Sequence, residues 1–361
     1  MAGRGDAGGP LTGPLVQLGG AAPMVPGAQT AATGPMEDGF GRRIEYLRVS
    51  VTDKCNLRCV YCMPEEGLPW LRRDQLLSYE EIAGVVRLMA GLGLKRVRIT
   101  GGEPLVRRDL PDLVRMLRRI PAIEDIALST NAVLLGEQAA ALRSAGVDRL
   151  NVSLDSLRPE RIDAIARRAG SAERIFRGLD AAERAGFAPL KINCVVMRGR
   201  NDDEIGDFAR ITRERPWHVR FIEVMPTGEN LGVSRDEFVS SDEILARVRG
   251  IGELSPVPGP PGNGPATYFA FAGAPGTIGV ITPMSHNYCD RCNRMRLTAD
   301  GQLRPCLFGA LQTNLRDALR RGEPLEPLIR HTLRIKPERH WLVRGSAEGS
   351  GGLAALSEVG G

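Results

Sequence analysis

The chain is poor in cysteine and has no long apolar run, and each of these shortages excludes a class of protein. Seven cysteines in 361 residues are too few for a disulfide scaffold, and an odd number cannot pair completely. No stretch approaches the roughly 20 apolar residues of a membrane span. The first 40 residues also lack the charged start and the apolar core of a secretory signal. We therefore expect a cytoplasmic protein that does not bind a membrane.

The chain also has only a small excess of positive charge. Its 48 Lys and Arg residues and its 43 Asp and Glu residues give a net charge of +5. This excess is too small for a nucleic-acid-binding surface, and the arginines lie within motifs rather than in runs. The sequence contains neither GxxxxGK[ST] nor a GxGxxG after a predicted strand, which argues against a P-loop and against a dinucleotide fold. Any nucleotide phosphate must therefore be held by side chains.

From Glu45 onward, short β-branched runs alternate with longer amphipathic patterns. The runs predict six strands, over 46–51, 96–100, 125–129, 149–154, 190–195 and 219–224. The patterns between them predict helices over 79–90, 110–119, 137–145, 172–185 and 202–213. Six strand–helix repeats indicate an α/β fold with a parallel sheet, namely a partial (βα)6 barrel of the TIM type. Such barrels place their active sites at the carboxyl ends of the strands.

Composition divides the chain into three segments. Residues 1–40 are rich in Gly, Ala and Pro, and we expect a disordered tail without a catalytic role. Residues 41–228 hold the predicted barrel. Residues 229–361 are less regular and form a separate C-terminal region, in which a metal site would compensate for a thin core.

Three cysteines within eight residues follow the first predicted strand, at Cys55, Cys59 and Cys62. Three thiolates can hold one corner of an iron–sulfur cluster that normally takes four ligands, which leaves one iron open to a small molecule. A structural zinc knuckle is the alternative, although zinc sites usually use paired C-x2-C hooks and close with a fourth ligand. The spacing C-x3-C-x-aromatic-C resembles the signature of radical S-adenosylmethionine (SAM) enzymes.

Polar segments follow the next three predicted strands. Gly101-Gly102-Glu103 resembles the segment that binds the SAM amino group in radical SAM enzymes, and Glu103 offers a carboxylate to an ammonium. Ser129-Thr130-Asn131 and Ser153-Leu154-Asp155-Ser156 offer hydroxyl and amide groups to ribose or carboxylate oxygens. Either of these two segments is equally well explained as the cap of the next helix.

A second cysteine triplet, Cys289, Cys292 and Cys306, lies in the C-terminal segment. Its spacing fits iron–sulfur or zinc, because His286 is near enough in sequence to complete a zinc tetrahedron. Arg294 and Arg296 point the same way if this segment is extended, and guanidinium groups suit triphosphates or nucleobase carbonyls. The alternative is a pair of arginines on a solvated edge strand. The seventh cysteine, Cys194, lies in an apolar run and is expected in the core.

Residues 41–361 resemble the GTP 3′,8-cyclase family of molybdenum cofactor biosynthesis, which belongs to the radical SAM superfamily. The resemblance rests on residues 47–55, on the GGEPL segment, on residues 221–226, on C-x2-C-x13-C and on the terminal diglycine. It implies a SAM-cleaving [4Fe–4S] cluster on the first triplet and a second [4Fe–4S] cluster, which binds the purine, on the second triplet. The implied SAM contacts are Tyr61, Gly102, Glu103, Ser153 and Met225, and the implied GTP contacts are Arg48, Arg98, Ser129, Lys191, Arg294, Met295 and Arg296. The implied catalytic residues are Arg48, Arg294, Arg296, Gly360 and Gly361, and Ser129 stands where the family usually has Thr.

The resemblance also implies a reaction and its partners. The expected enzyme is a lyase that converts GTP to (8S)-3′,8-cyclo-7,8-dihydroguanosine 5′-triphosphate. An electron donor and, downstream, cyclic pyranopterin monophosphate synthase are the expected partners, and the resemblance leaves a homodimer open. Two other hypotheses remain, namely a radical SAM peptide maturase or dehydrogenase with an auxiliary cluster, and a binding module that is stabilised by zinc in the second triplet.

Overall fold

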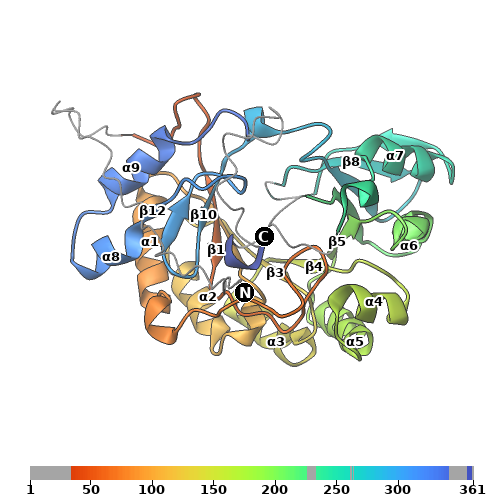
Figure 1. Cartoon of the computed structure of the whole chain (residues 1–361), viewed down its shortest axis with the longest axis horizontal. Coiled ribbons are helices and arrows are strands. Elements are labelled where there is room, and N and C mark those ends of the chain that lie inside the picture. The colour runs from red at the N-terminus through yellow and green to blue at the C-terminus, as the bar shows by residue number, and fades with distance from the viewer. Residues whose placement is uncertain (1–33, 226–232, 261, 263, 341–355, 360–361) are drawn as a thin grey trace, which may run out of the picture. The chain divides into compact units, whose positions relative to one another are not determined.

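A computed structural model describes residues 34–225, 233–260, 262, 264–340 and 356–359 (Figure 1). Residues Pro35–Gly361 form one compact unit, and the other unit, Met1–Gly34, lies almost wholly outside the described residues. No helix in the described part of the chain is long and apolar enough to cross a membrane. All seven cysteines are free thiols, so none of them forms a disulfide.

Six parallel strands pair in chain order and form the partial barrel that the sequence predicts. Helices follow the strands, and between β1 and β6 one of them was not predicted, namely α4, a helix of 8 residues with three buried side chains. The other predicted elements are confirmed to within a few residues at their ends. The strands are β1 (Tyr46–Ser50), β2 (Arg96–Thr100), β3 (Asp125–Thr130), β4 (Arg149–Ser153), β5 (Lys191–Val196) and β6 (His218–Glu223), and the helices are α1 (Tyr79–Gly91), α2 (Leu110–Arg118), α3 (Leu135–Ala145), α4 (Pro159–Ala166), α5 (Ser171–Arg184) and α6 (Ile205–Glu214).

Alternating side chains give each barrel strand an outer, apolar face and an inner face. On β1, Leu47 and Val49 are fully buried in the hydrophobic core, whereas Arg48 between them is not part of that core. Successive side chains of a strand point to opposite faces of the sheet. The apolar face therefore packs against the surrounding helices, and Arg48 points to the inside of the barrel.

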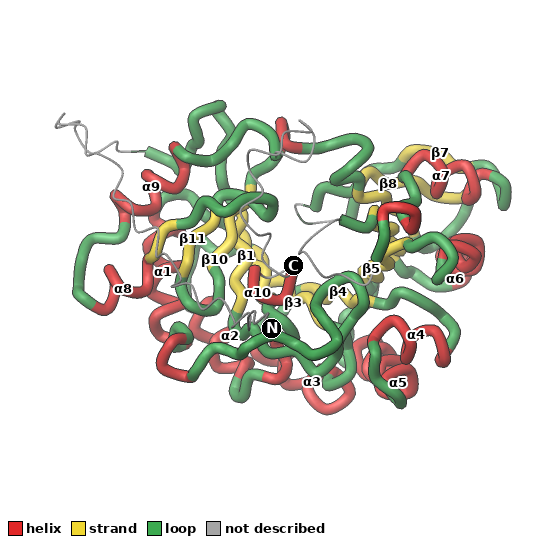
Figure 2. Tube along the Cα trace, viewed as in Figure 1, coloured by secondary structure: helices red, strands yellow, loops and turns green. Residues whose placement is uncertain are grey.

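The strands of the C-terminal segment pair with the strands of the barrel. They extend the barrel into one 12-stranded sheet in the order β12-β11-β10-β1-β2-β3-β4-β5-β6-β9-β8-β7 (Figure 2). An open parallel sheet leaves unpaired backbone groups at its edges, and these strands satisfy them. The added strands are β7 (Leu254–Pro256), β8 (Thr267–Phe271), β9 (Thr277–Ile281), β10 (Arg294–Leu297), β11 (Gln302–Arg304) and β12 (Thr313–Asn314), with the helices α7 (Ser241–Arg249), α8 (Leu315–Arg320) and α9 (Glu326–Arg334).

The segment between β9 and β10 joins the two sides of the barrel. Strand β9 pairs in parallel with β6, and β10 pairs in parallel with β1. Residues 282–293 must therefore pass from the β6 side to the β1 side, and they carry Cys289 and Cys292 with them (Figure 1). The predicted boundary at residues 228 and 229 lies outside the described residues.

The last residues of the predicted tail, which the structure describes from residue 34, include buried side chains. Met36 is buried, its N–H donates to the carbonyl of Leu92 at 2.9 Å, and its carbonyl accepts from the N–H of Ile44 at 2.8 Å. The buried carboxylate of Asp38 pairs with Arg42 at 2.6 Å. This short segment is held by the barrel because Met36 has an apolar site to enter there.

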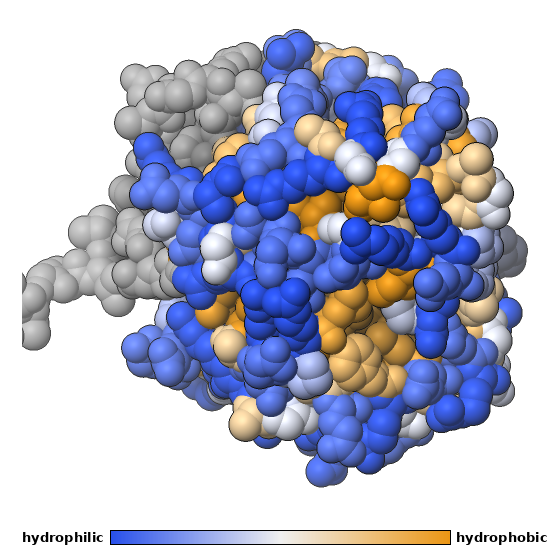
Figure 3. All heavy atoms as spheres, turned by 90° about the vertical axis from the view of Figure 1, so that its right-hand side faces the viewer, coloured by the Kyte–Doolittle hydropathy of each residue, from blue (hydrophilic) through white to orange (hydrophobic). Residues whose placement is uncertain are grey.

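The helices α4 to α7 lie on the right in Figure 1, and the view in Figure 3 faces that side. Polar side chains dominate the surface there, and apolar side chains show between them in the middle of the view. Among the described residues, a hollow with a volume of about 200 Å³ is lined by Phe176 and Leu179 of α5, by Ile211 of α6 and by Trp217. The outer faces of the helices are therefore mainly solvated, as amphipathic helices around a barrel should be.

Candidate active site

The first cysteine triplet lies in the loop after β1, and the glycines after β2 hold this loop in place. The N–H of Gly102 donates to the carbonyl of Thr52 at 2.8 Å, and the N–H of Glu103 donates to the carbonyl of Lys54 at 2.8 Å. A Cβ atom on Gly102 would lie 2.4 Å from the carbonyl oxygen of Lys54, so only glycine fits there. The close approach that requires glycine is therefore made to the loop that leads into Cys55.

Glu103 connects the loops after β2 and β3. Its buried carboxylate accepts from the hydroxyl of Thr130 and from the N–H of Asn131, both at 2.7 Å, and from the N–H of Leu105 at 3.1 Å. Burial raises the pKa of Glu103 to about 7, although these hydrogen bonds oppose the shift. The carboxylate is occupied by partners within the chain, so its contact with the SAM ammonium stays a prediction.

Asp155 after β4 and Val195 of β5 support Tyr61, which lies between the second and third cysteines. The hydroxyl of Tyr61 donates to Asp155 at 2.7 Å, and the N–H of Val195 donates to the same carboxylate at 2.8 Å. Burial raises the pKa of Asp155 to about 6. Tyr61 and Ser153 line one small cavity together with Cys59. Asp155 belonged to a segment that the sequence analysis singled out for its hydroxyls, and its role in holding Tyr61 appears only in the structure.

The first triplet has the chemistry that an iron–sulfur cluster requires. Cys55, Cys59 and Cys62 are free, and burial together with the neighbouring thiols raises the pKa of Cys59 well above its usual range. Among the described residues, no three His, Cys, Asp or Glu side chains are grouped closely enough to hold a single metal ion. A cluster spreads its ligands over separate iron atoms, and it needs thiolates that are near one another without meeting at one point. The residues present fit this group.

Three arginines lie side by side on adjacent strands at the inside of the barrel. In the sheet, Arg48 of β1 is the register partner of Arg98 on β2 and of Arg296 on β10. Arg48 and Arg98 are buried, and burial, followed by the charges of Arg296 and Arg98, lowers the pKa of Arg48 well below its usual range. The Nε atom of Arg98 is buried and has no hydrogen-bond partner in the described part of the chain. Charges buried so close together require an anionic partner.

Strands β5 and β6 add two more cations. Burial, then the charges of Arg149, Arg220 and Arg98, lowers the pKa of Lys191 to about 6. Burial lowers the pKa of Arg220 to about 10, and its guanidinium donates to the side chain of Asn151 at 2.7 Å. The sequence analysis missed Arg220. Strict alternation along β6, with Arg220 between the apolar Val219 and Phe221, was the signal that could have found it.

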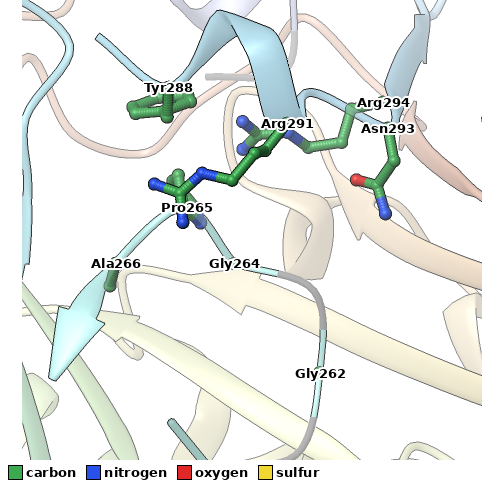
Figure 4. Close-up of a pocket in the computed structure, with 8 residues that line it drawn as sticks. All are labelled: Gly262, Gly264, Pro265, Ala266, Tyr288, Arg291, Asn293 and Arg294. Atoms are coloured by element: carbon green, nitrogen blue, oxygen red, sulfur yellow. The ribbon is translucent and has the colours of Figure 1, made fainter. Parts of the chain in front are cut away.

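The second triplet lies beside the arginines of β10. The guanidinium of Arg294 stacks on the ring of Tyr288 at 5.0 Å from the ring centre, and both residues line a cavity with a volume of about 210 Å³ (Figure 4). Arg291 extends into the same space in the close-up. Burial raises the pKa of Cys292, but Lys336 and Arg294 outweigh it and bring the value to about 7. The thiolate form of Cys292 is therefore favoured, whereas burial raises the pKa of Cys289.

Two predicted residues near the second triplet are placed differently from expectation. Met295 packs its side chain into the hydrophobic core, so only its backbone is left for the predicted substrate contact. The ring of His286 is exposed, and its Nε2 atom lies 2.9 Å from a carboxylate oxygen of Asp242. This orientation does not support His286 as the fourth ligand of a zinc ion. Cys194 is buried in the core, as predicted.

The other residues that were predicted to bind SAM or GTP lie at or near the ends of the barrel strands. Ser129 is on β3 beside Asn151 of β4, and the half-buried Met225 follows β6. The short helix α10 (Leu356–Val359) lies at the centre of Figure 2. The carbonyl of Val359 accepts from Arg296 at 3.2 Å, and a backbone hydrogen bond from Ser357 reaches Cys62. The helix thus contacts the first triplet and an arginine of β10, while Gly360 and Gly361 lie outside the described residues.

The chain is similar to known proteins over most of its length. Residues 49–211 match the radical SAM superfamily, and residues 217–342 match the family described as Molybdenum Cofactor Synthesis C. A GTP 3′,8-cyclase of Moorella thermoacetica is 45% identical over 329 residues, which cover 90% of this chain and 100% of that protein. The chain belongs to the GTP 3′,8-cyclase family. A second GTP 3′,8-cyclase, of Pelotomaculum thermopropionicum, is 46% identical over 330 residues and equally well covered.

Solved structures outside the GTP 3′,8-cyclase family share the fold. SuiB of Streptococcus suis bound to S-adenosylmethionine has a TM-score of 0.56 at 14% identity, over 80% of this chain and 68% of that chain. SuiB bound to the precursor peptide SuiA has a TM-score of 0.55 at the same identity, over 80% and 66%. At this identity the likeness establishes the radical SAM fold and says nothing about the substrate.

Proposed function

We propose that the chain converts GTP to (8S)-3′,8-cyclo-7,8-dihydroguanosine 5′-triphosphate, the first step of molybdenum cofactor biosynthesis. The proposal is supported by family membership over nine tenths of the chain. The observation that carries it is the barrel interior, where basic side chains of β1, β2, β5 and β6 are buried and Arg296 of β10 lies beside Arg48. A nucleoside triphosphate supplies negative charge to such an interior.

Within this proposal the residues fall into two groups by their chemistry. Arg48, Arg98 and Lys191 neutralise the triphosphate, and the hydroxyl of Ser129 adds a hydrogen bond to the nucleotide. Arg294 and Arg296 bind the purine, because planar guanidinium groups fit its ring oxygen and nitrogens. The barrel excludes water from the reacting carbon atoms and fixes their separation, which is the contribution a protein makes when cofactors carry the reaction.

The cofactors would be held by residues at both ends of the interior. Cys55, Cys59 and Cys62 would hold a [4Fe–4S] cluster, and Tyr61, Gly102, Ser153 and Met225 surround the place for SAM. When bound, the cluster and SAM supply the radical that removes hydrogen from C3′ of GTP. Cys289, Cys292 and Cys306 would hold the second [4Fe–4S] cluster, which supplies an open iron for the purine. The terminal Gly360 and Gly361 follow α10 and would reach the reacting atoms.

We place the enzyme in the cytoplasm, where thiolate ligands stay reduced. Its substrate is GTP, its electrons come from a reductant protein, and its product passes to cyclic pyranopterin monophosphate synthase. Each of these partners follows from the proposed reaction and is tested with it.

Anaerobic incubation with GTP, SAM and dithionite tests the proposal directly. We expect 5′-deoxyadenosine and the cyclised nucleotide to form together, and neither to form when GTP is left out. Production of 5′-deoxyadenosine that does not exceed the GTP-free control would reject the proposal. ATP in place of GTP is the matched control, because it offers the same triphosphate with a different purine.

A radical SAM peptide maturase is the alternative that shares the fold. It is not favoured, because its auxiliary clusters generally require more than three cysteines in the C-terminal extension, where this chain has three. Such enzymes also lack a pair of arginines like Arg294 and Arg296, which this chain directs from β10 toward the same interior as Arg48.

A further inference from the structure

Lys336 is a buried cation with an unusual set of partners. Its side chain follows α9 and only 3% of the residue is exposed. The Nζ atom donates to the carbonyl of Pro305 at 2.6 Å and to the carbonyl of Arg294 at 3.1 Å. Its third contact is the Sγ atom of Cys292 at 3.6 Å. None of the ion pairs among the described residues includes Lys336.

The three contacts match the hydrogen-bonding capacity of an ammonium group. A lysine ammonium has three N–H donors and no acceptor, and here each donor has one acceptor. Burying a charge is costly unless an opposite charge is near. No carboxylate fills that role among the partners of Lys336, so the only partner able to carry negative charge is the thiolate of Cys292.

The first triplet has a different environment. Cys55 receives the amide of Asn131 at 3.9 Å and the N–H of Leu57 at 3.4 Å, both of which are neutral donors. The carboxylate of Asp155 lies close by through its hydrogen bond with Tyr61. A cation thus contacts a ligand sulfur in the second triplet, and a neutral amide does so in the first. The first triplet has charges of both signs nearby, from Glu103, Asp155 and Arg58, but among the described residues no hydrogen bond joins a cation to one of its sulfur atoms.

We propose that Lys336 is a positioning residue of the second iron–sulfur site, where its N–H···S hydrogen bond orients the Cys292 thiolate and raises the reduction potential of the cluster. The proposal rests on the second cluster of the proposed function. A reduced cluster carries one more negative charge than the oxidised one, so a neighbouring cation stabilises the reduced form more. Hydrogen bonds to ligand sulfurs and the net charge of the site are recognised determinants of cluster potential.

The experiment isolates the second cluster in a Cys55→Ala, Cys59→Ala, Cys62→Ala background. This background should hold about four iron atoms per chain, and its potential is measured by an anaerobic redox titration followed by electron paramagnetic resonance. Lys336→Met and Lys336→Gln remove the charge, and the glutamine can still donate to the two carbonyls. Lys336→Arg keeps the charge. Leu333→Ala, on the same segment, removes buried packing but no charge and is the matched control.

We expect both neutral variants to shift the one-electron equilibrium at least tenfold toward the oxidised cluster, which is about 59 mV. Lys336→Arg should stay within about threefold of the parent, and Leu333→Ala should lower the melting temperature without moving the potential. Iron lost from both neutral variants but kept in Lys336→Arg and Leu333→Ala would support the orientation of Cys292. Equal reduction potentials in the neutral and the charged variants would overturn the role proposed for Lys336 and leave the proposed function standing. If the background protein, with Lys336 in place, held no second cluster, both the role of Lys336 and the proposed function would be overturned.

Discussion

Five basic side chains enter one barrel interior, namely Arg48, Arg98, Lys191, Arg220 and Arg296. Burial lowers the pKa of most of them, and that of Lys191 to about 6, so four of the five are cations near neutral pH without a ligand. Folding alone gains nothing from such crowding, because like charges in a poorly solvated space repel one another. A ligand with several negative charges removes that penalty when it binds. At the scale of single residues, the combined positive charge of the site therefore favours a polyphosphate ligand, and no single contact indicates this ligand as clearly.

Arg294→Ala should weaken GTP binding and leave the first triplet able to hold its cluster. Loss of a hydrogen bond to a charged group costs about 1.5–3 kcal/mol, so the dissociation constant should rise roughly 10- to 100-fold. Binding to the anaerobically reconstituted protein is measured by calorimetry, with Arg177→Ala on the exposed face of α5 as control. An unchanged affinity in Arg294→Ala would remove the role proposed for this side chain.

Lys191 predicts a pH dependence of GTP binding. Without ligand its pKa is about 6, mainly because of burial and then because of neighbouring arginines, so the side chain is largely neutral near neutral pH. A bound triphosphate raises that pKa, and binding then takes up a proton. The association constant should therefore fall, by at most tenfold per pH unit, as the pH rises above about 6. Calorimetry at about pH 7.5 in buffers of different ionisation enthalpy measures the uptake.

The matched variant for this test is Lys191→Met, which has no proton to gain. Its GTP affinity should be lower than that of the parent below about pH 6 and should lose most of the pH slope above it. Equal proton uptake by the parent and by Lys191→Met would assign the titration to another group.

Among the elements, β10 connects the sheet to the site. It pairs in parallel with β1 and thereby places Arg296 beside Arg48, while its other face is buried in the core through Met295 and Leu297. A strand that is anchored on one face holds the side chains of its other face in fixed positions. The arginines at i and i+2 were predicted to point the same way, and the pairing with β1 explains why they point into the barrel.

The C-terminal helix α10 gives a prediction at the same scale. Its backbone contacts Arg296 and Cys62, so the helix itself lies within the site. Deleting Gly360 and Gly361 should abolish cyclisation, by a factor of about 100 or more, while the fold and the iron content stay unchanged. Product formation and melting temperature are measured on the same preparation. An active truncation would mean that the last residues are only a frayed end.

At the scale of the whole molecule, one sheet carries both triplets. The first follows β1, and two cysteines of the second lie on the segment that passes from β9 beside β6 to β10 beside β1. The N-terminal segment adds a support, because Arg42 donates to the carbonyls of Cys289 and Pro337, each at 2.7 Å. Parts of the chain that are far apart in sequence therefore hold the second triplet together.

Anaerobically purified protein should contain about eight iron and eight sulfide per chain, the sum of two four-iron clusters. Replacing Cys289, Cys292 and Cys306 by alanine should halve both values and leave the first cluster. About four iron together with one zinc in the parent would instead support a zinc-stabilised binding module. Metal analysis and electron paramagnetic resonance distinguish these results.

The sequence alone determined the six barrel strands, the first triplet and most of the cations, because period-two alternation and cysteine spacing are local properties of a chain. Tertiary structure decided that the C-terminal strands complete the same sheet, that Lys336 contacts Cys292, and that Met295 packs into the core. These facts depend on pairing and burial between residues that are far apart in sequence, such as Arg42 and Pro337, which are 295 positions apart. Such distant contacts leave no periodic trace in a single sequence, since each strand edge and buried charge finds its partner only when the chain is folded.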